Sequence, residues 1–250
     1  IAKNVALSLV PADVDVCISL DMDAWLPADW RQHLEMLWQP HHTRMRHSYH
    51  YVDAQGEFVR NYPHAKVHSR RGYHWQRCVH EEMVFVGSQE QVFDCPEWRI
   101  LEHQDDSKDR NGYVQLLHQA LAENPQDTMA MYWLALEYQN RGNAAEAVQW
   151  HSAYVRQPDA QSFLMGHSYH YLSAHLPEQR VQHLENAVRH NAGLCAAWAA
   201  LGQHHYHNHD WINCMWACHQ GIHQLHQGAE ADQHTRVVLY DTGALACDRL

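Results

Sequence analysis

Positive charge is scarce in this 250-residue sequence, which has 18 Lys and Arg against 29 Asp and Glu and a formal net charge of −11. That balance argues against a protein that coats nucleic acid, because such a protein needs a basic surface to meet the phosphates. Hydrophobic residues still make up 46% of the chain. This content is enough to build a core and argues against disorder.

The sequence also shows no signal peptide and no run of about 18 apolar residues, the length that a membrane-spanning helix needs. We therefore expect no membrane span and a cytoplasmic location. The seven cysteines are odd in number and include no CxxC pair. We expect free thiols in a reducing compartment, because a disulfide framework has paired cysteines.

The charge is uneven along the chain. Seven Lys and Arg residues but only two acidic residues lie between Arg44 and Arg77, so this segment can meet an anion even on an acidic protein. The 25 histidines are spread over the whole sequence. Because scattered histidines cannot all be ligands, we interpret each one as structural unless its position indicates otherwise.

Residues 1–104 combine patterns typical of helices with patterns typical of strands. The predicted elements are a helix over residues 1–10, a buried strand over 14–20, a helix from Pro27, a hairpin around Gln55-Gly56, and strands over 81–86 and 97–103. The second helix places Trp30, Leu34 and Leu37 on one face. This order of elements predicts an α/β sheet domain.

From residue 105 the pattern changes to helices with a repeat. Small residues recur at positions 135, 168 and 202, which are 33 and 34 residues apart, and Tyr154, Ala187 and Gly221 follow 19 residues after them. This spacing is similar to the tetratricopeptide repeat, in which small residues lie where two helices cross. We expect residues 105–250 to form stacked tetratricopeptide-like repeats, because each helix pair leaves an apolar face that only a neighbour covers.

Two carboxylates follow the first predicted strand, in the sequence Asp21-Met22-Asp23. Side chains two residues apart in a strand point to the same side, and ligands of open α/β sheets bind beyond the strand ends. Oxygen ligands at this spacing suit Mg²⁺ or Mn²⁺ that also holds a diphosphate. The alternative interpretation is a polar turn with a helix cap.

The segment SRRGYHWQRCVHEEMVF, residues 69–85, combines arginines, aromatic residues and the pair His80-Glu81. Arginine pairs with phosphate oxygens through two hydrogen bonds. Trp75 can stack on a sugar or base, and Glu81 can take a proton from a hydroxyl. The alternative is an exposed basic loop ahead of an ordinary strand. Further along, His103 ends an apolar run, either as a ligand or as a structural histidine.

These motifs, in this order, resemble glycosyltransferases of the GT-A fold, and most of all family 2 members in which tetratricopeptide-like repeats follow the catalytic domain. The resemblance covers residues 1–155 and lies in Lys3-Asn4-Val5-Ala6-Leu7, Asp21-Met22-Asp23, His80-Glu81 and His103. Only twenty residues precede the acidic motif, where the family has a much longer segment. We therefore expect residues 1–104 to be an N-terminally incomplete GT-A-like domain that binds nucleotide weakly by itself.

The resemblance implies an inverting transfer of a sugar from a nucleoside-diphosphate sugar, such as a UDP-sugar, to a hydroxyl of a protein or glycan. It implies that Asp21, Asp23 and His103 hold Mn²⁺ or Mg²⁺ on the diphosphate, and that Glu81 is the general base. It also implies a set of donor-binding residues: Lys3, Asn4, Asp21, Arg70, Arg71, Trp75 and His80.

Two other functions stay open from the sequence. The basic, aromatic-rich residues 44–77 can admit DNA that carries a modified base with a free hydroxyl, although the net charge of −11 weighs against it. Alternatively, the chain is a non-catalytic repeat scaffold. The repeats either bind a peptide or a second subunit, or simply pack on the catalytic domain. The histidine-rich residues 202–210 complete no zinc-binding pattern.

Overall fold

The computed structural model describes residues 2–53, 55–103, 111–229 and 233–249. The chain forms two compact units, Ile1–Asn111 and Gly112–Leu250. The first unit mixes helices and strands, whereas the second is helical. The division predicted between residues 104 and 105 falls on residues that lie outside the described ranges.

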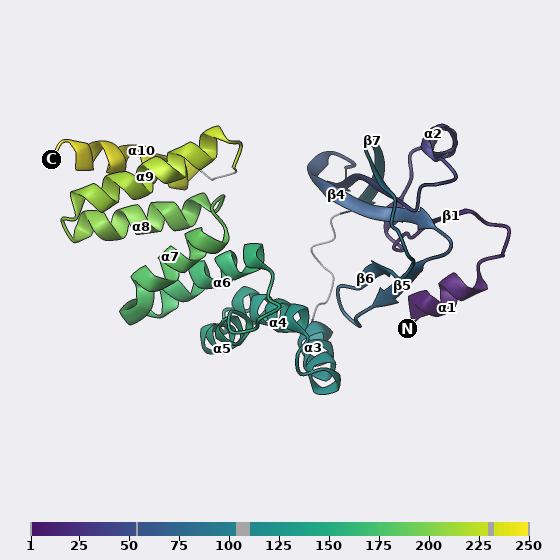
Figure 1. The fold of residues 1–250 in the computed structure, drawn as a ribbon, viewed down its shortest axis with the longest axis horizontal. Coiled ribbons are helices and arrows are strands. Elements are labelled where there is room, and N and C mark those ends of the chain that lie inside the picture. Colours follow the sequence, from purple (N-terminus) through teal and green to yellow (C-terminus); the bar gives the residue numbers. More distant parts are fainter. Residues whose placement is uncertain (1, 54, 104–110, 230–232, 250) are drawn as a thin grey trace. The chain divides into compact units, whose positions relative to one another are not determined.

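The first unit, called here the sheet unit, has short helices and strands (Figure 1). In chain order its elements are α1 (Ala2–Leu9), β1 (Val16–Ile18), β2 (Ala24–Trp25), α2 (Trp30–Leu37), β3 (Arg44–Val52), β4 (Phe58–Ser69), β5 (Tyr73–Gln76), β6 (Glu82–Phe85) and β7 (Val92–His103). Five strands form one sheet in the order β1-β4-β3-β7-β2, and β5 pairs with β6. Among the described strands only β3 and β7 pair in parallel.

The hairpin predicted around Gln55-Gly56 is confirmed, because β3 and β4 pair antiparallel on either side of it. Gly56 has a φ of +85°, a left-handed conformation that glycine adopts without steric cost. The Asp53 side chain accepts hydrogen bonds at 2.9 Å from two backbone N–H groups within the turn. The turn and the strands that it joins set a register in which His47 lies opposite His64.

Helix α2 covers the sheet with the apolar face that the sequence predicted. Leu34 is 7% exposed, and Trp30 and Leu37 are partly buried against the same core. The sheet side of that core consists of buried residues of β3, β4 and β7: Met45, Tyr49, Val67, Cys95, Trp98 and Ile100. Removal of this apolar surface from water holds α2 on the sheet.

The sheet differs from the predicted one in how its strands pair. The apolar run at 14–20 predicts a fully buried strand, but β1 has three half-buried residues and pairs antiparallel with β4. The strand predicted at 81–86 belongs to the separate β5–β6 pair. Local alternation identifies a strand without showing its partner. A mixed sheet followed by helical repeats is confirmed, and the GT-A assignment stays a prediction.

The second unit, called here the repeat unit, consists of helices and one 3₁₀ turn within its described residues (Figure 1). In chain order these are α3 (Asn111–Glu123), α4 (Thr128–Asn140), α5 (Ala144–Tyr154), α6 (Ser162–His175), η1 (Pro177–Gln179), α7 (Arg180–His190), α8 (Cys195–His207), α9 (Trp211–His226) and α10 (Gln233–Cys247). From α4 to α10 each helix packs on the next along the chain. The predicted helical repeat is therefore confirmed.

Small residues lie where the repeat helices cross, as the spacing predicted. The small residues at these positions are all buried: Ala135, Ser168, Ala187, Gly202 and Gly221. A Cβ added to Gly202 would lie 2.6 Å from Cys218 Sγ, and one added to Gly221 would lie 2.5 Å from Leu239 Cδ2. Real Cβ atoms essentially never approach so closely, so the absence of a side chain lets these helices pack together.

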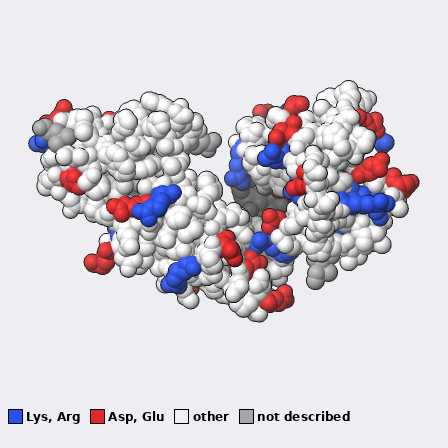
Figure 2. All heavy atoms as spheres, in the orientation of Figure 1, with Lys and Arg blue, Asp and Glu red and all other residues white. Residues whose placement is uncertain are grey.

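The surface of the repeat unit has few charged groups on the face that Figure 2 shows, where they stand among many uncharged residues. The unit contains no lysine.

In the part of the chain that the structure describes, no helix combines the length and the apolarity needed to cross a membrane. All seven cysteines are free thiols, of which Cys78 and Cys247 are exposed.

Candidate functional site

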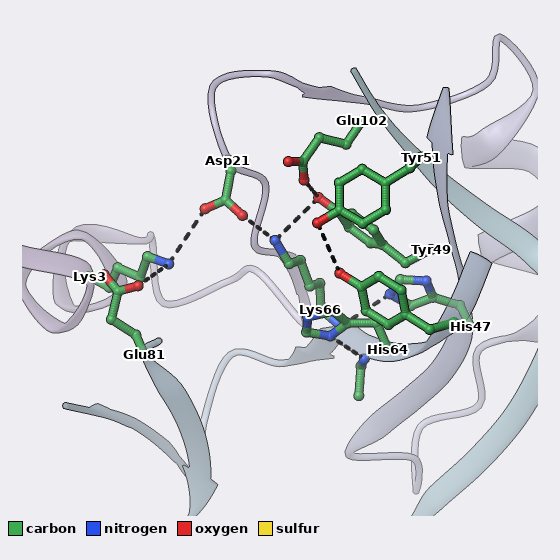
Figure 3. A network of polar contacts seen from close by, with 11 residues as sticks. Lys3, Asp21, His47, Tyr49, Tyr51, His64, Lys66, Glu81 and Glu102 are labelled. Carbon is green, nitrogen blue, oxygen red and sulfur yellow. Dashed lines mark hydrogen bonds and ion pairs between the residues drawn. The ribbon is translucent and has the colours of Figure 1, made fainter. Parts of the chain in front are cut away.

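Lys3 joins residues from three segments of the sheet unit. Its Nζ lies 3.5 Å from Asp21 Oδ1 and 3.3 Å from Glu81 Oε2 (Figure 3). The same ammonium group lies 4.6 Å from the centroid of the Trp75 ring, within the range of a cation–π interaction. Four residues that the sequence predicted for the site are therefore neighbours, although they are spread over 78 positions.

Asn4 holds α1 against β5. Its Oδ1 accepts a hydrogen bond from the backbone N–H of Trp75 at 2.7 Å, and its Nδ2 donates to the Trp75 carbonyl oxygen at 2.7 Å. These two bonds imitate the way a neighbouring strand would pair with β5. Asn4 therefore positions Lys3, the preceding residue, over the indole ring. We assign Asn4 a positioning role in this geometry.

Asp21 is held from its other side by Lys66, a residue of β4 that the sequence analysis did not single out. Lys66 Nζ donates to Asp21 Oδ2 and lies 3.4 Å from the hydroxyl of Tyr49. That hydroxyl donates in turn to Glu102 Oε2 at 2.5 Å. A continuous chain of polar contacts thus runs from Glu81 through Lys3, Asp21, Lys66 and Tyr49 to Glu102 (Figure 3).

The two lysines set the charge state of Asp21. Partial burial works to raise the pKa of this carboxyl, but the hydrogen bond and charge of Lys66, together with Lys3, outweigh it and leave the pKa below its ordinary value. Burial and the adjacent Glu102 carboxylate raise the pKa of Tyr49 far above its ordinary value. Asp21 is therefore an anion at neutral pH, and Tyr49 stays a hydrogen-bond donor.

The cluster borders a cavity of about 250 Å³ in the sheet unit. Its polar lining includes Lys3, Asp21 and Lys66, and Trp75 contributes an aromatic wall. The remaining walls come from Ala6 and Leu7 of α1, from Val10 and from residues 17–20 around β1. A mostly apolar cavity with a few convergent charged groups is the usual form of a small-molecule site.

The predicted metal ligands do not come together. His103 Nδ1 lies 3.1 Å from the backbone oxygen of Asp53, and the His103 ring lies 4.6 Å from the ring of Trp25. Asp23 lies in the turn before β2. No three His, Cys, Asp or Glu side chains in the described part of the chain are grouped so that they can hold a metal ion. As placed, these residues do not fit Mn²⁺ or Mg²⁺, which need several oxygen ligands.

The predicted phosphate-binding arginines are not part of the cavity lining that contains Lys3 and Lys66. Arg70 donates from Nε and Nη2 to the backbone oxygen of Val10, at 2.9 and 2.7 Å. Arg71 lines a different cavity of about 410 Å³, together with Arg70 and Trp38. His80 lies in the loop between β5 and β6 with a φ of +51°. Arg70, Arg71 and His80 are all absent from the lining of the 250 Å³ cavity that contains Lys3 and Asp21.

Comparison with known proteins gives matches among solved structures. No family model and no curated protein matches the chain. One solved structure of MamA matches with a TM-score of 0.44 and 16% identity, over 56% of this chain and 72% of that chain. A second structure of MamA matches with a TM-score of 0.39 and 15% identity, over 56% of this chain and 87% of that chain. A thermophilic TPR protein in Thermus thermophilus gives a TM-score of 0.36 at 21% identity, over 54% of this chain and 73% of that chain. The repeat assignment rests on the helix packing itself.

Proposed function

We propose that the sheet unit is a glycosyltransferase of the GT-A type, which moves a sugar from a nucleoside-diphosphate sugar to a hydroxyl acceptor with inversion. One observation carries the proposal. Lys3, Asp21, Trp75 and Glu81 are far apart in sequence but lie in one cluster, beside a cavity. Convergence of a carboxylate base, a cation and an aromatic wall at a cavity is what a transfer site needs.

In the proposed reaction the acceptor oxygen bonds to the anomeric carbon while the bond from that carbon to the diphosphate oxygen breaks. Glu81 takes the proton of the acceptor hydroxyl. The side chain of Glu81 is 40% exposed, so an acceptor can reach it. Trp75 faces the cavity next to Lys3 and offers the sugar an aromatic surface.

The predicted Mn²⁺ or Mg²⁺ enters no step of this proposal, because Asp21, Asp23 and His103 are not gathered as ligands.

The proposed acceptor is a hydroxyl of a protein or glycan, in preference to modified DNA. Four of the seven cations between residues 44 and 77 are engaged by groups outside the cluster of Lys3, Lys66 and Asp21: Arg44 by Glu90, Arg46 by Asp94, Arg77 by Glu82 and Arg70 by the backbone oxygen of Val10. Few of these charges are left for phosphates of a nucleic acid.

The test is a transfer assay with the 250-residue chain. A panel of labelled nucleotide-sugars is combined with separate pools of peptides, glycans and hydroxymethylated DNA, and the products are identified by mass spectrometry. We expect one donor to label the peptide or glycan pool, and Glu81→Gln to lose that labelling. Absence of any transfer across the panel would overturn the proposal and favour the non-catalytic scaffold.

A second function is supported for the repeat unit, as a module that binds a peptide. Helices α7, α8 and α9 border a cavity of about 450 Å³ whose apolar lining includes Val188, Leu201 and Trp216, with Glu185 and Arg189 beside them. Trp216 is 51% exposed, and exposed tryptophans often anchor partners.

A peptide array tests this second function. We expect Trp216→Ala to abolish binding of the peptides that the wild-type chain retains. Phe163→Ala is the matched control, because Phe163 is a similarly exposed aromatic residue at 60% on helix α6, and it does not line the cavity. Equal losses in both variants would show general stickiness, and self-association in light scattering would favour a second subunit.

A further inference from the structure

Lysine is rare in this protein, and its placement is unusual. The whole sequence contains three lysines, Lys3, Lys66 and Lys108, of which the last lies outside the described residues. The other two come from α1 and β4, and both meet the carboxylate of Asp21 from opposite sides (Figure 3). Two of three lysines therefore share one carboxylate, and Lys3 also pairs with Glu81.

Of Lys3 and Lys66, Lys66 loses more hydration when it is placed beside Asp21. Its side chain is only 10% exposed, and a charged ammonium group loses its hydration when it is buried unless partners replace the water. Its partners are Asp21 and the Tyr49 hydroxyl, and its Nζ also lies 4.8 Å from the centroid of the Tyr49 ring. A buried ammonium group on the wall of a cavity is a candidate for binding a ligand in that cavity.

The lining of the cavity favours an anion. Lys3 and Lys66 contribute two positive charges and Asp21 contributes one negative charge. Glu81 pairs with Lys3 at 3.3 Å and Glu102 accepts a hydrogen bond from the Tyr49 hydroxyl. Neither carboxylate is part of the lining, so the excess of positive charge holds for the lining and not for the whole network. A divalent cation would have to displace both ammonium groups from Asp21, whereas an anion can bind them on their cavity side.

We propose that this cavity binds the diphosphate group of the donor through Lys3 and Lys66, which supply the positive charge that the resemblance assigns to a divalent cation. The inference rests on the proposed transfer and names how its leaving group is held. Asp21 acts as the counter-ion that keeps the two ammonium groups oriented while the cavity is empty of ligand. The ammonium groups then stabilise the charge that develops on the departing diphosphate.

Calorimetric titration of the full chain with inorganic pyrophosphate tests this inference, once in EDTA and once with Mn²⁺. We expect binding in EDTA, and a Kd that rises at least about tenfold in Lys3→Met and in Lys66→Met, the loss expected for one charge-assisted contact. Arg46→Met is the matched control, because it removes an exposed cation of the same unit that pairs with Asp94. Lys3→Met carries the test alone if circular dichroism shows that Lys66→Met is unfolded.

The variant Asp21→Asn distinguishes a lysine site for diphosphate from a metal site at Asp21, because the two assignments predict opposite changes in pyrophosphate affinity. If the lysines bind the diphosphate, removal of the counter-ion frees both ammonium groups and tightens pyrophosphate binding by about threefold or more. If Asp21 is a metal ligand, the same change abolishes binding. The inference is overturned by binding that requires Mn²⁺, by weakened binding in Asp21→Asn, or by lysine variants that bind like the Arg46→Met control.

The outcomes also separate this inference from the proposed function. Sugar transfer that depends on Mn²⁺ would overturn the lysine site and leave the glycosyltransferase standing. Metal-independent pyrophosphate binding without transfer from any donor in the panel would leave the anion site standing and overturn the transferase. Both properties together, in the absence of a metal ion, are the expected result.

Discussion

His47 and His64 lie face to face across the β3–β4 hairpin, with ring centroids 6.3 Å apart and ring planes inclined by 8°. Each ring accepts a backbone hydrogen bond that requires an unprotonated nitrogen. His47 Nε2 accepts from the Lys66 N–H at 3.1 Å, and His64 Nδ1 accepts from the Ala65 N–H at 2.7 Å. The pair is therefore a neutral element of the sheet, next to the lysine that orients Asp21.

The sheet unit is expected to lose stability in mild acid because of this pair. Burial first, and then the charge of Lys66, lower the pKa of His47 and of His64 from 6.5 to about 4. The unfolded chain thus binds more protons between pH 6.5 and 4, so stability is complete above that window and falls through it. Each histidine contributes a slope of up to about 1.4 kcal/mol per pH unit.

Hydrogen exchange of β3 and β4 peptides at several pH values measures this loss. His64→Gln is expected to flatten the acid dependence, since one titrating ring is gone. His33→Gln, which changes an exposed histidine of α2, is expected to leave it unchanged. An acid slope that is the same in His64→Gln and wild type would contradict the prediction.

Glu81→Gln is expected to lower kcat for the proposed transfer by about 10²- to 10⁴-fold, the usual contribution of a general base. The substitution keeps the shape of the side chain but removes its ability to accept the hydroxyl proton. KM for the donor is expected to fall or stay the same and not to rise, because the substitution also removes a carboxylate that pairs with Lys3. Glu57→Gln, an exposed acid at the β3–β4 turn, is the control; full activity in Glu81→Gln would refute the assignment.

Gly202→Ala is expected to destabilise the repeat unit by about 1–3 kcal/mol, the cost of overpacking a close helix crossing. The new methyl group would lie 2.6 Å from Cys218 Sγ. Gly112→Ala is the matched control, because Gly112 also lies in a helix but has open space around it, and it is expected to be neutral or stabilising by up to about 1 kcal/mol. Urea unfolding followed by far-UV circular dichroism compares them, and equal stabilities would show that the crossing is not tight.

Asn4→Ala is expected to release α1 from β5. The substitution leaves the N–H and carbonyl of Trp75, an 8% exposed residue, without their partner, at a cost of about 1–3 kcal/mol. Hydrogen exchange of the peptide that contains Trp75 is expected to speed up. Ser8→Ala removes only an exposed hydrogen bond within α1 and is expected to change nothing; protection of Trp75 that survives Asn4→Ala would contradict the role of Asn4.

Local pattern was sufficient for much of the fold. The hairpin at Gln55-Gly56, the buried face of α2 and the glycines of the repeat all lie where periodicity placed them, because turn chemistry and amphipathic spacing act over a few residues. For the candidate site, the motifs and the resemblance named Lys3, Asp21 and Glu81, and the structure places Lys3 next to both carboxylates. The motifs missed Lys66, and the scarcity of lysine was the available signal. They also grouped His103 with Asp21 and Asp23, which the structure does not bring together as ligands.

The sequence by itself determined the helical repeats, the β3–β4 hairpin and the apolar face of α2, and it named candidate side chains for the proposed transfer site. Only the tertiary structure decided which of those side chains meet. The antiparallel pairing of β4 with β1 and the register of the β3–β4 hairpin carry Lys66 to Asp21, and the bonds of Asn4 to β5 carry Lys3 there. Such meetings depend on packing between residues tens of positions apart, and periodicity within one segment contains no information about them.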